Sequence, residues 1–90
     1  MSESRTFHGI TEDVLNCVKQ ASTREQGTVY DPPEGTEGLS TTQTIVGKVV
    51  ISYSLDTSSG DITYRIVERP VLAPEYEIWK GIENALNECR

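Results

Sequence analysis

The sequence predicts an α+β domain in two layers, with an N-terminal and a C-terminal helix packed on one face of a small antiparallel sheet. Residues 44–69 alternate apolar and polar side chains with a period of two, as the arms of one central β-hairpin do. A segment on each side of the hairpin repeats apolar residues at helical spacing. The 90 residues suffice for one modest core. The expected order is α-β-β-α, with room for a third short strand.

Residues 1–9 are expected to form a flexible N-terminal tail, and residues 10–90 a single α+β domain. The tail, MSESRTFHG, is polar, and Phe7 is its one apolar residue beyond Met1. Phe7 could therefore pack against the domain or remain exposed.

A first helix is predicted from Ile10 to about Arg24. Thr11 is a suitable N-cap, and Ile10 and Leu15 can form a hydrophobic staple around it. Gly27 is a natural end for this helix. The apolar stripe consists of Ile10, Val14, Cys17, Val18 and Ala21.

The segment 28–42 separates the helix from the hairpin. Thr28–Tyr30 could form a short edge strand. The prolines and glycines of 31–38 exclude a helix or a central strand there. A loop of this length is either functional or flexible, and a flexible loop is the favoured interpretation.

Within the hairpin, a four-residue loop between Asp56 and Asp61 sets the register. Tyr53 then lies opposite Tyr64, with Leu55 opposite Ile62 and Ile51 opposite Ile66, so that apolar residues face each other. The predicted inner face consists of Ile45, Val49, Ile51, Tyr53, Leu55, Ile62, Tyr64 and Ile66.

A second helix is predicted to begin with Pro74 at its first position. Its apolar face consists of Ile78, Trp79, Ile82, Ala85, Leu86 and Cys89. Gly81 lies on that face, where a glycine costs about 1 kcal/mol relative to alanine. Close packing on a neighbour is the favoured reason, and a binding notch is the alternative. A third strand is expected from Thr28–Asp31 or Arg69–Ala73, or from another chain.

Charge and composition restrict the function. The net charge of −6 disfavours nonspecific nucleic-acid binding, and no apolar run reaches the ~18 residues of a membrane span. One histidine and two cysteines without a CxxC argue against a zinc site, and phosphate-binding and hydrolase motifs are absent. We therefore expect no enzyme and no cofactor, and we assign no catalytic, cofactor-binding or metal residue.

Cys17 and Cys89 each lie on the apolar stripe of a predicted helix. They could form a disulfide between the helices, or they could be two buried thiols. Without a signal peptide the default location is the cytoplasm. A disulfide, together with a Met1 added to a mature chain, would indicate a secreted or periplasmic protein.

The outer face of the hairpin is the predicted partner-binding surface. In the expected register Lys48 faces Arg69, Val50 faces Val67 and Ser52 faces Arg65, which leaves valines among basic residues. The alternative is an ordinary solvated sheet face. The candidate site residues are Val46, Lys48, Val50, Arg65, Val67 and Arg69.

The sequence thus favours a small non-enzymatic protein-interaction domain that uses this face or a strand edge, with another protein or a second copy of itself, as a homodimer, for its partner. One alternative is a small-ligand-binding protein or enzyme with a cleft lined by Tyr53, Tyr64 and Trp79. Another alternative is a secreted inhibitor or toxin-related domain stabilised by the disulfide.

Overall fold

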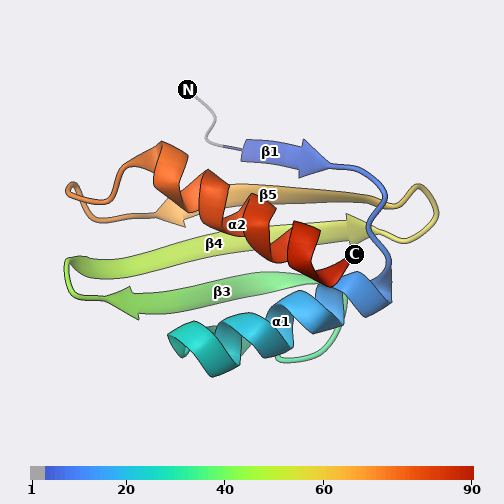
Figure 1. The fold of residues 1–90 in the computed structure, drawn as a ribbon, viewed down its shortest axis with the longest axis horizontal. Helices are drawn as coiled ribbons and strands as arrows, with labels where there is room; N and C mark the ends of the chain where they lie inside the picture. The colour runs from blue at the N-terminus through green and yellow to red at the C-terminus, as the bar shows by residue number, and fades with distance from the viewer. Residues whose placement is uncertain (1–3) are drawn as a thin grey trace.

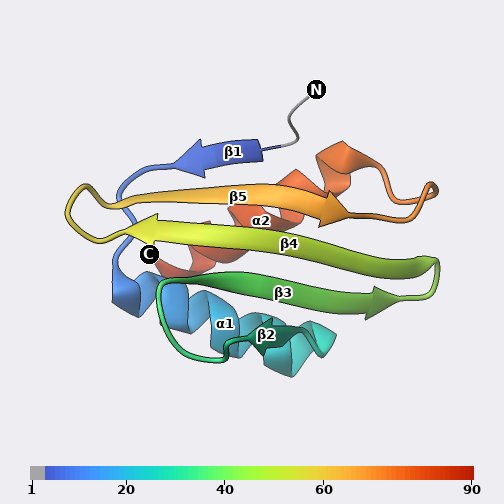
Figure 2. The same cartoon turned by 180° about the vertical axis from the view of Figure 1, so that it is seen from behind.

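The computed structural model describes residues 4–90 and places two helices over one face of a five-stranded antiparallel sheet (Figures 1 and 2). The sheet order is β1-β5-β4-β3-β2. The α+β class is confirmed, but the order α-β-β-α around one hairpin is wrong, because the chain runs β-α-β-β-β-β-α. The elements are β1 (Ser4–Phe7), α1 (Glu12–Gln26), β2 (Val29–Asp31), β3 (Glu37–Thr44), β4 (Gly47–Asp56), β5 (Asp61–Glu68) and α2 (Glu75–Cys89).

The hairpin β4–β5 is the centre of the sheet, and most of its predicted register is confirmed. Tyr53 pairs with Tyr64, Leu55 with Ile62 and Ile51 with Ile66. Beyond Ile51 the register shifts, so that Val50 pairs with Glu68. The predicted pairs Val50–Val67 and Lys48–Arg69 are therefore wrong. Val67 is the extra residue of a β-bulge, which an unbroken alternating pattern does not indicate.

Strand β4 begins at Gly47, later than the predicted start at Thr44. Ile45 and Val46 form the turn between β3 and β4, and Ile45 is fully exposed instead of lying in the core. Gly47 has a φ of 135°, and a Cβ at this residue would lie 2.9 Å from Pro70 Cγ. A positive φ and a close neighbour both require glycine here. The turn interrupts a pattern that resembles one continuous strand.

Strand β3 was not predicted, because EGLSTTQT has almost no apolar alternation. It nevertheless pairs with β4 from Glu37 to Thr44. Its backbone hydrogen bonds to two neighbours hold it, since β2 pairs with its other edge. Strand β2 confirms the short edge strand that was expected within 28–31.

Residues 4–7 form the edge strand β1 in a segment predicted to be a flexible tail. The strand pairs with β5, Phe7 contacts the Tyr64 ring edge-to-face, and the Arg5 guanidinium lies 5.3 Å from the centre of the Trp79 ring. Backbone pairing and one aromatic contact are enough to hold this edge strand, so its sequence contains few of the apolar residues by which strands are predicted. Residues 1–3 of the predicted tail lie outside the described residues.

The boundaries of the two helices follow local sequence signals. The Thr11 hydroxyl accepts a hydrogen bond from the Val14 N–H at 3.2 Å, and Gly27 ends α1 with a φ of 69°. Pro74 precedes α2 as its N-cap, so its prediction as the first helical residue is wrong by one position. The close packing favoured for Gly81 is also wrong, because no atom lies within 4 Å of a Cβ built there.

The core lies between the helices and the inner face of the sheet. Every predicted inner-face residue except Ile45 is buried or partly buried. The side chains with the least exposure are Ile10, Leu15, Ile62 and Leu86.

Lys19 was not predicted to be buried, yet it lies under the loop that joins β2 to β3. Its Nζ donates a hydrogen bond to the Gly35 carbonyl at 2.7 Å and lies 5.2 Å from the centre of the Tyr53 ring. Desolvation lowers the pKa of Lys19, and the nearby Glu34 carboxylate partly opposes this effect. The loop predicted to be flexible therefore has a specific anchor on α1.

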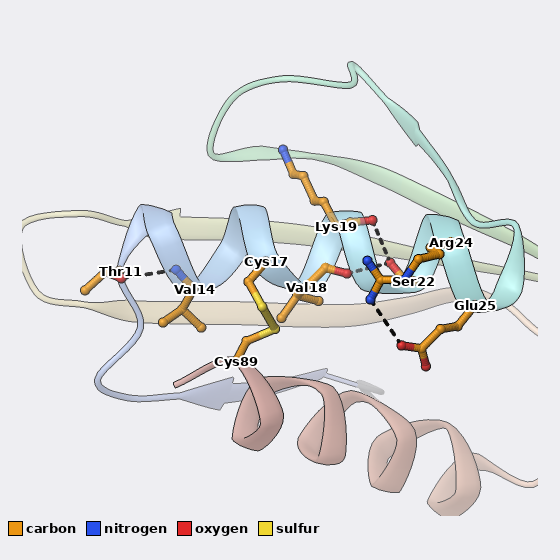
Figure 3. The surroundings of a disulfide bond; sticks show 9 residues. All are labelled: Thr11, Val14, Cys17, Val18, Lys19, Ser22, Arg24, Glu25 and Cys89. Carbon is orange, nitrogen blue, oxygen red and sulfur yellow. Dashed lines mark hydrogen bonds and ion pairs between the residues drawn. A yellow bond between two sulfur atoms is a disulfide. The ribbon is translucent and has the colours of Figure 1, made fainter.

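Cys17 and Cys89 form a disulfide that joins the first half of α1 to the last residue of α2 (Figure 3). Their Cα atoms lie 5.7 Å apart, and 72 positions separate them in the sequence. In a chain of this size, the bond ties both ends of the domain together.

We expect the double variant Cys17→Ser/Cys89→Ser to lose about 4 kcal/mol of unfolding free energy, because an unlinked unfolded chain has more conformational freedom. Urea denaturation of the oxidised protein and of the variant measures the difference. The reduced wild type is the matched control and should resemble the variant. A loss below about 1 kcal/mol in both would contradict this prediction.

Candidate functional site

The six residues predicted to bind a partner do not form one basic surface. Lys48 Nζ lies 4.0 Å from Glu68 Oε1, and Arg69 donates a hydrogen bond to the Ala73 carbonyl at 3.1 Å. Val46 lies in the β3–β4 turn. Val50 and Arg65 lie on the outer sheet face, which no layer covers within residues 4–90 (Figure 2). The bulge places Glu68 instead of Val67 opposite Val50, so an acidic side chain lies among the valines and cations that were predicted to form the surface.

An exposed apolar cluster lies at one end of the sheet instead. It is formed by the β3–β4 turn and by the loop from β5 to α2, which approach each other at the same end of the molecule in both views (Figures 1 and 2). Val71 is 94% exposed and Leu72 is 77% exposed. We call this cluster the apolar end, and it consists of the exposed apolar residues of the turn and the loop, Ile45, Val46, Val71 and Leu72.

The apolar end has no explanation in the fold. Burying one aliphatic side chain contributes about 1.5–3 kcal/mol, and fully exposed side chains such as Ile45 contribute none of it. Tight turns favour glycine, asparagine and aspartate, whereas this turn carries two β-branched apolar residues. Grouped apolar exposure of this kind is typical of an interaction site.

A second feature is a cavity of about 250 Å³ between α1, α2 and the sheet, which we call the helix cleft. Tyr64 is the one residue of the predicted aromatic set that lines it. Tyr53 and Trp79 are core residues, and the Trp79 indole N–H donates to Glu75 Oε1 at 3.1 Å. The apolar lining includes Val18, Ala21, Ile51, Ile78, Ile82 and Ala85.

The hydroxyl groups that line the helix cleft are almost all hydrogen-bonded. Ser22 Oγ lies 2.6 Å from Tyr30 Oη, and Thr28 Oγ1 lies 2.7 Å from Thr42 Oγ1. The Tyr64 hydroxyl is the exception, because it is buried and has no hydrogen-bond partner. Such a group costs roughly 1–3 kcal/mol of stability.

The remaining polar groups do not assemble a metal site. No group of three or more His, Cys, Asp or Glu side chains within residues 4–90 is arranged to hold a metal ion. His8 forms a surface pair with Asp61, with Nδ1 at 2.6 Å from Oδ1. No helix in the same residues is long and apolar enough to cross a membrane.

Comparisons with known proteins returned no match among protein-family models, curated proteins or solved structures. The functional argument therefore depends on the geometry of this chain.

We expect Tyr64→Phe to leave the unfolding free energy unchanged or to raise it by up to about 1 kcal/mol, because the removed hydroxyl has no partner. The matched control is Tyr30→Phe, which loses the bond to Ser22 and should cost about 1 kcal/mol. Urea denaturation of both variants checks the contrast. A larger loss for Tyr64→Phe than for Tyr30→Phe would contradict it.

Alkaline pH is expected to destabilise the protein. Burial raises the pKa of Tyr30, Tyr53 and Tyr64 above the ordinary value of 10.0, because each phenolate would be desolvated. The unfolded chain therefore releases protons above about pH 10 that the folded chain retains, and stability falls as pH rises. Lys19 acts in the opposite sense, because its lowered pKa makes the folded chain release a proton first.

Three tyrosines outweigh one lysine, so we expect the unfolding free energy to be level to about pH 9 and to fall above about pH 10. Urea denaturation across this range, with the disulfide intact, measures the effect. Tyr64→Phe should reduce the slope with which the unfolding free energy falls with pH. A rise in the unfolding free energy over the same range would contradict the attribution of the pH dependence to the buried tyrosines.

Proposed function

We propose that this protein is a small non-enzymatic protein-binding domain whose apolar end inserts into an apolar groove on another protein. The observation that carries the proposal is the full exposure of Ile45 and the almost full exposure of Val71, on two loops that approach each other at one end of the sheet (Figure 1). Interfaces place apolar side chains at their centre and polar groups at their rim. The ion pair of Lys48 and Glu68 supplies such a rim, since both residues flank the two loops.

The shape of the apolar end supports a groove as its partner. Its side chains project from two neighbouring loops, and a Cβ on Gly47 in the first loop would lie 2.9 Å from Pro70 in the second. Projecting aliphatic groups are buried most completely by a concave surface. Val50 and Arg65 on the adjoining sheet face could extend the contact, which keeps part of the predicted partner-binding set in the proposal.

A second copy of the chain is the alternative occupant, as in a homodimer. The disulfide supports a proposed location in an oxidising compartment, such as the periplasm or the extracellular space, because reducing compartments keep cysteine thiols reduced.

Ile45→Ser and Leu72→Ser are expected to abolish binding of the partner without loss of stability. Both side chains are exposed, so the unfolding free energy should change by less than about 0.5 kcal/mol. Photo-crosslinking from residue 45 should give a specific adduct that excess wild-type protein competes away and excess Ile45→Ser protein does not. Val29→Ser is the matched control, because Val29 is an exposed valine on β2 outside the apolar end.

Light scattering separates the two occupants. A monomeric wild type with a competed heterologous adduct supports the proposal. A dimer that Ile45→Ser dissociates would show that the partner is a second copy of the chain. Equal crosslinking from residue 45 and from Thr57, in the distant β4–β5 loop, would contradict the proposal that the apolar end is a binding surface.

A further inference from the structure

The helix cleft exists because the two helices meet at one end and diverge at the other. The disulfide joins them where α2 ends (Figure 3), and α1 and α2 separate toward the opposite end of the sheet (Figure 1). The space between them, at about 250 Å³, is larger than the roughly 150 Å³ of an apolar cavity that takes up benzene. A molecule somewhat larger than benzene would therefore fit.

Gly81 opens this space. It lines the helix cleft on the face of α2 that points toward α1, and no atom lies within 4 Å of a Cβ built there. The backbone of α2 is regular at this residue, so glycine meets no conformational need. A mid-helix glycine with neither a special φ nor a close neighbour lowers helix stability without any benefit to the fold. What it does provide is an unobstructed cavity.

The lining of the helix cleft offers a ligand apolar surface but no available tyrosine or serine hydroxyl. The Tyr64 hydroxyl has no hydrogen-bond partner, but its oxygen is fully buried and is not exposed in the helix cleft. The hydroxyl groups of Ser22, Thr28 and Tyr30 are already paired. A ligand in the helix cleft is therefore held mainly by its apolar surface.

The rim of the helix cleft is acidic. Glu25, Glu77 and Glu88 line it and are exposed, and no Lys or Arg of the described residues does so. Arg24 lies 3.5 Å from Glu25 and offsets one of the three charges. The remaining negative charge favours a cation at the mouth and disfavours an anion.

We propose that the helix cleft is a binding site for a small, mainly apolar amine. Its apolar body lies between the two helices, and its ammonium group stays at the rim near Glu77, at the end where the helices diverge. This site is independent of the apolar end, because none of the residues that define the apolar end lines the helix cleft.

Tyramine is a suitable probe, because it carries an aromatic ring at one end and an ammonium at the other. Titration of the full-length oxidised protein, followed by amide NMR shifts, should show saturable binding with a dissociation constant below about 1 mM and shifts confined to the lining of the helix cleft. Phenethylamine, which lacks the hydroxyl, should bind at least as tightly, because the apolar body of the ligand and its ammonium group carry the binding. The anion 3-(4-hydroxyphenyl)propionate should bind several-fold more weakly than tyramine, by a margin that shrinks in high salt.

Substitutions separate binding from folding. Gly81→Leu should weaken tyramine binding by at least about tenfold, because its side chain occupies the cavity, while removal of glycine raises the melting temperature. Gly81→Ala is the matched control, and it should raise the melting temperature but retain most of the binding.

Nonsaturable or dispersed shifts would overturn the site. Wild-type affinity in Gly81→Leu would place any binding elsewhere, and an anion that binds as tightly as tyramine would overturn the assignment to amines. A failure of these tests leaves the apolar end untouched, since Ile45→Ser and Leu72→Ser report on that surface separately.

Discussion

The bond between Cys17 and Cys89 is the constraint on which the arrangement of the helical layer depends. Both helices rest on one face of the same sheet, and the disulfide fixes their separation at only one end. A domain of this length has a small core, so a covalent link across 72 positions contributes a large part of its stability. With that end held, the packing of the other end is decided by the side chains on the sheet beneath.

Those side chains differ between the two halves of the sheet. The inner face of β4 and β5 carries large apolar residues such as Leu55 and Ile62, which α1 and α2 cover. The inner face of β3 carries Ser40 and Thr42, which bond to neighbouring backbone and side-chain oxygens. A hydroxyl-lined strand offers the helices little apolar surface to bury, and the space above it remains as the helix cleft.

The features that lead to function are those that the fold itself does not need. Burial of apolar groups explains the core, hydrogen bonds from Lys19 explain the loop anchored above it, and a positive φ and a close neighbour require glycine at Gly47. The exposed Ile45 and the open Gly81 are neutral or unfavourable for stability. Real proteins break local rules of this kind at functional sites, which makes these two residues the ones to test.

Local chemistry in the sequence was enough to predict the α+β class, both helices, the Thr11 cap and the pairing of Tyr53 with Tyr64, because each depends on residues close in sequence or on a strict period of two. The apolar stripes of the two helices also predicted that Cys17 and Cys89 point into the same interior, but they did not decide between a disulfide and two free thiols.

Only the tertiary structure decided the rest. Strands β1 and β3 are held by backbone pairing, which side-chain patterns do not record. The bulge at Val67 brought the acidic Glu68 opposite Val50, which perfect alternation does not predict. The exposure of Ile45 and the emptiness around Gly81 depend on how distant segments pack, and neither is encoded by its neighbours in the chain.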